Sequence, residues 1–206
     1  MSKRNGIELG GLLALIVLVT LLGPAEKTLG TTARIIYIHG ALVWVAIMVF
    51  CATALLGAAG LLARRQCLHE WSRVGGQVAL IFWAGYLPLS MWAAQASWGH
   101  IFLDDPSFQR AFRILAVSLI VQVIVWIFPR PIWTASALNI IPFAIMVLQL
   151  NSARQLMHPD SPIRNAESPL IQVYFYFLSA LCALLAVGVG RWMLKRKRAL
   201  QGGASG

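Results

Sequence analysis

Histidines are the residues of this chain best suited to binding a metal or moving a proton. His39 stands in the apolar stretch RIIYIHGALVW, and His158 stands in the polar stretch LMHPDSPIRN. An imidazole inside an apolar helix needs a hydrogen-bond partner or a ligand, because an unsatisfied polar group in hydrocarbon is costly. Pro159 and Pro162 restrict the backbone beside His158, so its loop can present the imidazole to a ligand. For either histidine, an ordinary hydrogen bond or solvent is the alternative.

A third segment, WAAQASWGHIFLDDPSFQRAF, combines aromatic residues with two adjacent carboxylates. Trp92 is typical of the aromatic belt that membrane proteins place at the lipid–water interface. The run from Trp98 through Phe102 predicts an apolar loop that ends at Asp104 and Asp105. A flat apolar ligand could rest on such a loop beside polar groups.

The composition predicts the kind of structural element that holds these residues in place. Hydrophobic residues make up 59% of the 206 residues, charged residues only 12%, and the mean hydropathy is +0.73. These values are far too apolar for a soluble domain. The sequence therefore predicts an all-α polytopic membrane protein, a bundle of six transmembrane helices in one domain over residues 1–206, with a disordered tail at about 199–206. The apolar runs are 7–22, 35–63, 75–94, 111–128, 132–150 and 170–194.

The distribution of basic residues predicts the orientation. Alternate sides of the six runs receive eleven and six Lys and Arg residues, and the more basic side of a membrane protein faces the cytoplasm. We therefore expect both termini in the cytoplasm, a location in the inner (plasma) membrane, and His39, His100 and His158 toward the outer side. The net charge of +10 is divided into short clusters beside apolar runs, which is not typical of nucleic-acid binding. The lipid bilayer is the expected surrounding.

Taken together, these segments resemble the haem-handling membrane proteins of cytochrome c maturation, of the CcmC and CcsA type. YIHGALVW is similar to the family's first-histidine segment and corresponds to a ligand position at His39. Trp98, Gly99 and Asp105 match the W-G-x5-D frame of the family's tryptophan-rich WWD domain, although the tryptophans between them are replaced here. His158, between the fifth and sixth runs, occupies the place of the second histidine. The resemblance implies a non-covalent b-type haem whose iron is bound by His39 and His158.

General chemistry is consistent with that expectation. Two histidines can fill both axial positions of haem iron while an apolar loop covers the porphyrin. The propionates need cationic partners, for which Arg34 and Arg110 are on the expected outer side. The role implied is to hold or pass haem, without catalysis, together with other cytochrome c maturation or respiratory membrane subunits. The predicted cofactor site comprises His39, His158, Trp98, Gly99, Phe102, Asp105, Arg34 and Arg110.

Two other function classes remain open. The first is an accessory or structural subunit of a respiratory or photosynthetic membrane complex, with no cofactor of its own. The second is a transporter, which the near absence of charged residues within the runs disfavours. Gln122 and Asn139 are the notable polar residues inside the runs, and hydrogen bonds between helices would account for both.

Overall fold

The computed structural model describes residues 3–151, 163 and 168–202, and its regular structure is helical throughout these residues. Four of the helices, α2, α3, α4 and α7, are long and apolar enough to cross a membrane, whereas two further apolar helices, 5–21 and 133–149, are shorter. The expected all-α fold is confirmed, and the four long apolar helices agree with the expected multi-pass membrane protein. The helices are α1 (Lys3–Leu21), α2 (Ala33–Ala63), α3 (Gln66–Trp98), α4 (Pro106–Ile127), α5 (Trp133–Leu138), α6 (Ile140–Asn151) and α7 (Pro169–Gly202).

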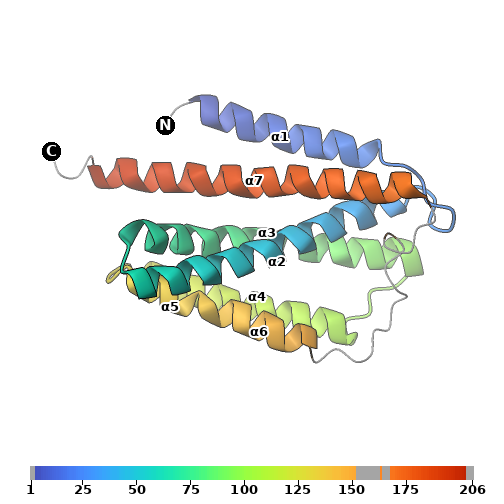
Figure 1. Ribbon diagram of the computed structural model, residues 1–206. Helices are drawn as coiled ribbons and strands as arrows, with labels where there is room; N and C mark the ends of the chain where they lie inside the picture. Colours follow the sequence, from blue (N-terminus) through green and yellow to red (C-terminus); the bar gives the residue numbers. More distant parts are fainter. Residues whose placement is uncertain (1–2, 152–162, 164–167, 203–206) are drawn as a thin grey trace.

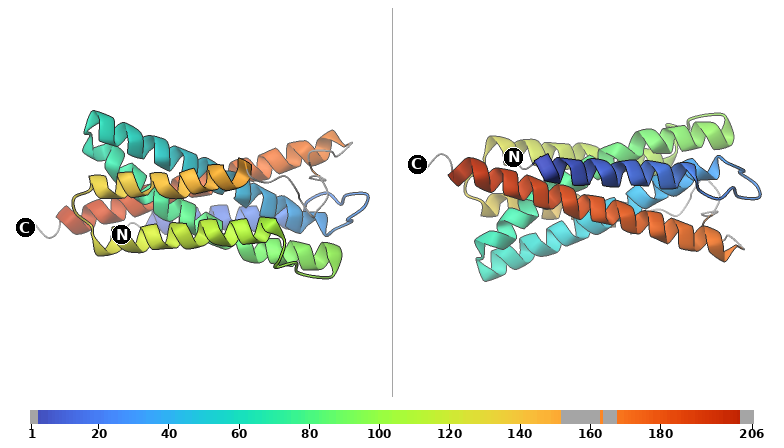
Figure 2. Two further views of the ribbon diagram at one scale, coloured as in Figure 1. Left: turned by 90° about the horizontal axis from the view of Figure 1, so that it is seen from below. Right: turned by 90° about the horizontal axis from the view of Figure 1, so that it is seen from above.

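The helices run back and forth, so the connections gather at two ends of the bundle (Figure 1). We call the end with both termini, the α2–α3 turn and the α4–α5 connection the terminal end. The other end holds residues 22–32 and 99–105, and we call it the loop end. The two further views agree on this arrangement (Figure 2). In Figure 1, α1 and α7 lie along one side, α2 and α3 in the middle, and α4 to α6 on the other side.

A core of apolar side chains joins these three groups of helices. It includes residues from α1, α2, α3, α4, α6 and α7. The α2 and α3 helices are joined by a short turn, in which Arg64 adopts a left-handed conformation with φ 53°. Phe50 of α2 meets Trp83 of α3 edge to face at 5.7 Å, and the Trp83 indole donates a hydrogen bond of 2.9 Å to the Ala111 carbonyl of α4. This indole bond ties α3 to α4 inside the apolar core.

The fifth apolar run departs from the expected single helix over 132–150. It is divided at Asn139 into α5 and α6. Pro142 cannot donate the hydrogen bond that would continue the ladder across this point. The division leaves Asn139 facing the interior of the bundle, where it is almost fully buried.

Two other helices extend past the apolar runs that predicted them. α3 begins at Gln66 and ends at Trp98, beyond the expected limits of 75 and 94. α7 continues to Gly202, four residues into the expected tail. A helix satisfies its own backbone hydrogen bonds in water as well as in lipid, so hydropathy alone does not define where it ends.

Candidate functional site

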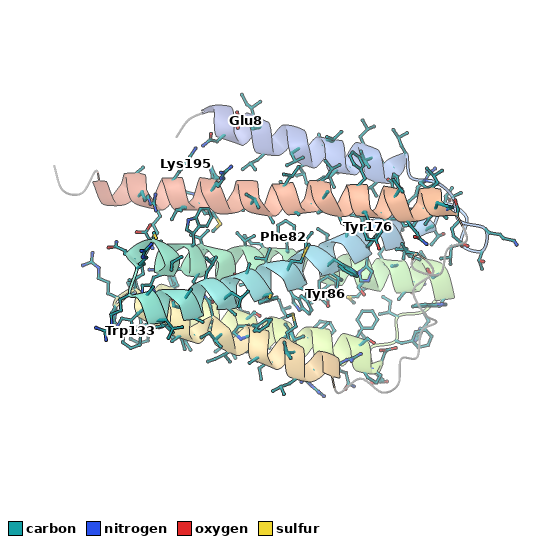
Figure 3. The ribbon with its side chains drawn as sticks, viewed as in Figure 1. Glu8, Phe82, Tyr86, Trp133, Tyr176 and Lys195 are labelled. Carbon is teal, nitrogen blue, oxygen red and sulfur yellow. The ribbon has the colours of Figure 1, made fainter. Side chains whose placement is uncertain are left out.

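His39 is the seventh residue of α2, about 9 Å from the start of the helix at the loop end. Its imidazole is half-buried and faces α3, where its ring centre lies 5.6 Å from that of Tyr86. The Tyr86 ring, labelled in Figure 3, packs in turn against the Trp83 ring with 4.7 Å between the ring centres. Trp83 is held by its hydrogen bond to α4. The His39 ring therefore packs on an anchored aromatic set, which consists of Tyr86 and Trp83.

Gly40 does not provide open space for a ligand beside His39. A Cβ atom at position 40 would lie 3.1 Å from Cε2 of Phe175 and 3.8 Å from Cδ1 of Ile163. The bulky group that approaches this glycine is therefore a side chain of α7, so the small residue is needed for helix packing.

The predicted second ligand, His158, lies outside the described residues. Ile163, five positions further along the chain, is buried and is close to Gly40. Five residues span at most about 18 Å when fully extended.

Trp98 and Phe102 form an exposed aromatic pair at the loop end. Their side chains are 48% and 43% exposed, and the two rings meet edge to face with centres 6.5 Å apart. His100 packs edge to face on Phe102 at 5.0 Å. The loop between α3 and α4 thus presents apolar rings on its surface, as the sequence predicts.

Gly99 and Asp105, the other residues of the W-G-x5-D frame, cap helices. Gly99 has φ 70° and donates its backbone N–H to the Gln95 carbonyl at 2.9 Å, which ends α3. Asp105 is only 5% exposed, and its carboxylate accepts the Ser107 N–H at 2.6 Å as the N-cap of α4. The loop geometry therefore requires both residues, whatever the loop binds.

Arg34 and Arg110 also make structural contacts. Nε of Arg34 donates to the Gly23 carbonyl at 2.9 Å and fastens the loop before α2. Arg110 donates to the carbonyls of Pro106 at 3.0 Å and Gln149 at 3.3 Å, and to the Ser107 hydroxyl at 3.1 Å. All three of its guanidinium nitrogens are used in this way. Arg110 is therefore a poorer partner for a propionate than the sequence predicts.

The structure brings the predicted residues together only in part. Trp98, Gly99, Phe102 and Asp105 share one short connection at the loop end. Arg34 and His39 lie at the same end, on the first two turns of α2. These described residues therefore share one end of the bundle, and their joint role in a cofactor site stays a prediction.

A second polar site, which sequence reasoning did not identify as a unit, lies nearer the terminal end. His69 of α3 makes a 2.7 Å hydrogen bond through Nδ1 with the Ser136 hydroxyl of α5. Gln122 of α4 donates to Asn139 at 2.8 Å, and Asn139 donates to the Ser72 carbonyl at 2.9 Å. The predicted helix-to-helix role of Gln122 and Asn139 is therefore confirmed. We call these five residues the inner polar cluster.

Glycines make room for the inner polar cluster. A Cβ atom at Gly57 would lie 2.7 Å from the Ser136 carbonyl oxygen, and one at Gly60 would lie 2.9 Å from Nδ1 of His69. At Gly76, it would lie 2.4 Å from Oδ1 of Asn139. The helices approach closely enough for these hydrogen bonds only because such positions lack side chains. The feature of the sequence that could have indicated this cluster is the spacing of small residues in α2 and α3.

The described residues give little support to disulfide chemistry or to a metal site made of protein side chains. Cys51, Cys67 and Cys182 are free thiols, and Cys182 is fully buried, as expected for a packed cysteine. Within the described ranges, His, Cys, Asp and Glu side chains do not gather in groups of three that could hold a metal ion.

No protein-family model matches the sequence, and no curated protein is significantly similar to it. Function must therefore be inferred from the site itself.

Proposed function

We propose that this protein binds haem at the loop end of the bundle, with His39 as an axial ligand of the iron, and holds or passes the haem there. The observation that carries the proposal is the environment of His39. Its half-buried imidazole stands in an apolar helix against an anchored aromatic set, beside the Ile163 segment that leads back to His158. Neutral imidazoles in apolar surroundings are common haem ligands.

His158 supplies the second axial bond in this proposal. A haem bound by two imidazoles holds their nitrogens about 4 Å apart, since each bond between iron and nitrogen is near 2 Å. The side chain of Ile163, in the same loop as His158, lies close to the Gly40 position of α2. Such a separation is therefore compatible with the length of chain between Ile163 and His158.

The aromatic pair Trp98 and Phe102 provides an apolar surface for the porphyrin at the same end. Burial of such a surface against a flat ligand is favourable at about 25 cal/mol per Å². Arg34 and Arg113 are better candidates than Arg110 to pair with the propionates. Arg113 is exposed, and its one hydrogen bond given by the structure is a 3.4 Å contact with Gln109.

The proposal also specifies how the chain crosses the membrane. All six apolar runs cross the bilayer, both termini are cytoplasmic, and the haem lies on the outer face of the inner membrane. It is supported by the excess of basic residues on the segments of the terminal end. The resemblance to the haem-handling proteins of cytochrome c maturation suggests maturation or respiratory subunits as partners.

The capping contacts favour a second candidate function. Gly99, Asp105 and Arg110 all have structural partners, so the sequence frame they form does not itself require a ligand. An accessory subunit of a respiratory or photosynthetic complex would keep these residues for folding alone. In that case the bundle packs against other subunits and has no cofactor.

Absorption spectra of the purified full-length protein separate the two candidates. Haem binding predicts a Soret band in the parent that is lost in His39→Ala and reduced in His158→Ala. His100→Ala serves as the matched control, because this exposed loop histidine is not assigned as a ligand. A parent protein without haem after expression with adequate haem supply, or a His39→Ala variant that keeps it, would reject the haem proposal in favour of the accessory role.

A further inference from the structure

The backbone of a helix does not by itself determine how a histidine ring on it is turned. The χ2 torsion of histidine has a broad distribution, so an imidazole on a fixed helix can still rotate about its Cβ–Cγ bond. A metal ligand needs one chosen ring nitrogen to face the metal, and the two nitrogens of the ring are distinct. Groups that pack on or bond to the ring therefore orient histidines that bind metals.

Helix α7 holds the backbone on either side of His39. The Tyr37 ring is buried and packs on the Tyr174 ring of α7, with 5.4 Å between the ring centres. A Cβ atom at Gly40 would lie only 3.1 Å from Cε2 of Phe175, which is also in α7. Successive residues of a helix are about 100° apart, so Tyr37 and His39 point to nearly opposite sides of α2. The backbone here is therefore packed on α7, and the His39 side chain is directed away from α7.

The Tyr86 ring of α3 lies against the His39 imidazole. The two ring centres are 5.6 Å apart and the ring planes meet at 51°, within the range of packed aromatic pairs. Rotation of the imidazole about χ2 would move its edges toward the tyrosine ring, so Tyr86 restricts this rotation. Nδ1 of His39 is buried. We therefore assign Nε2 as the nitrogen that meets a ligand.

Tyr86 is itself held in place by the core. It is only 5% exposed, and it packs edge to face on the Trp83 ring. The Trp83 indole donates its 2.9 Å hydrogen bond to the Ala111 carbonyl of α4, and Phe50 of α2 packs on the same indole. The contact that restrains His39 is thus anchored on α2, α3 and α4.

We propose that Tyr86 is a positioning residue for His39, and that its ring, held by Trp83, keeps the imidazole in the orientation that directs Nε2 to the haem iron. This inference rests on the proposed function. The tyrosine acts through the packing of its flat ring. Phenylalanine at position 86 keeps that contact, whereas leucine loses it and leaves the imidazole free to turn. Forming the axial bond then costs the ordering of the ring, so haem is held less tightly.

The rate of haem loss from the full-length protein in nanodiscs tests the positioning role. The rate is measured as transfer of haem to excess apomyoglobin. Tyr86→Leu should lose haem about ten times faster than the parent, since groups that orient a metal-binding histidine contribute at least this factor to affinity. Tyr86→Phe should restore the parent rate. Phe82→Leu is the matched control, because it also removes a buried aromatic ring from α3, one helical turn from Tyr86 (Figure 3).

The reactivity of His39 toward diethyl pyrocarbonate gives a second readout, in the haem-free protein. This reagent acylates the unprotonated nitrogen of accessible imidazoles, and mass spectrometry locates the product. The exposed His100 serves as the internal reference. In the parent, the held ring of His39 should react slowly relative to His100. Tyr86→Leu should raise this ratio several-fold, whereas Phe82→Leu should leave it unchanged.

The two readouts separate the positioning role from haem binding. A parent that binds no haem rejects the proposed function, and the reactivity of His39 then decides whether Tyr86 orients the ring. A parent that binds haem, with parent rates of haem loss in Tyr86→Leu, rejects the positioning role alone. Equal acceleration in Tyr86→Leu and Phe82→Leu also overturns it, because core packing in general would then explain the loss.

Trp83→Phe decides the matter if Tyr86→Leu does not insert into the membrane. This variant keeps an aromatic ring beside Tyr86 and removes the indole N–H that bonds to Ala111. Haem loss should be faster than in the parent, by a smaller factor than for Tyr86→Leu. A parent-like rate in Trp83→Phe, with unchanged reactivity of His39, overturns the proposal.

Discussion

The loop end and the inner polar cluster use polar residues in opposite ways. At the loop end, the side chains that attract notice in the sequence are exposed aromatics and residues that cap or fasten single loops. In the inner polar cluster, ordinary Ser, Gln, Asn and His residues bond across three helices, α3, α4 and α5, and are mostly buried. The exposed aromatic residues of the loop end therefore lie where a ligand can reach them. Inconspicuous ones determine how the helices pack.

The largest expected effect comes from adding bulk beside the inner polar cluster. Gly57→Val should lower the free energy of unfolding by about 2 to 3 kcal/mol, because its Cβ would meet the Ser136 backbone at 2.7 Å. Thermal unfolding in detergent measures the change. Gly85→Ala is the control, since no atom lies within 4 Å of its Cβ position. Equal losses for the two variants would show that the close approach at Gly57 does not matter.

Removing the buried histidine should have the next largest effect. His69→Ala leaves the buried Ser136 hydroxyl without this partner, which costs about 1 to 3 kcal/mol of unfolding free energy. His100→Ala, on the exposed loop, should change stability little. The same unfolding assay compares the two. If His100→Ala proves the more destabilising, the contrast between the two regions is wrong.

The Asp105 cap predicts a smaller effect on stability. Asp105→Ala should cost about 1 kcal/mol, whereas Asp105→Asn should cost less, because asparagine also caps helices well. Haem content at matched expression would then sharpen the comparison. If Asp105→Asn keeps stability but loses haem, the carboxylate has a role in binding beyond the cap.

The smallest effect on stability is expected at Phe102. Phe102→Ala should change the unfolding free energy by no more than about 0.5 kcal/mol, because the ring is exposed and its ring contacts in the structure are with the neighbouring Trp98 and His100. Haem retention should weaken without being abolished, since one aromatic face contributes less than an axial bond. The measurement is haem per protein beside His39→Ala. A Phe102→Ala variant as haem-free as His39→Ala would contradict this order.

Hydropathy predicted the membrane class and most of the helices. The runs that became α2, α4 and α7 are apolar over a bilayer's thickness, and Pro129 and Pro169 lie close to helix ends, since proline disrupts a helix interior. The gathering of Arg34, His39 and the aromatic loop at one end also followed from the alternation of helix direction. Such features depend on one segment at a time, so the order of residues along the chain is enough to predict them.

Contacts between helices could not be predicted in this way. Gly40 receives Phe175 of α7, and Asp105, which the sequence placed in a binding frame, caps α4. The partnership of His69 with Ser136 joins residues 67 positions apart. In lipid, helix pairing depends on close side-chain fit and on interhelical hydrogen bonds more than on hydrophobicity. The sequence alone therefore determined which segments enter the membrane, and only the tertiary structure decided which polar groups meet there.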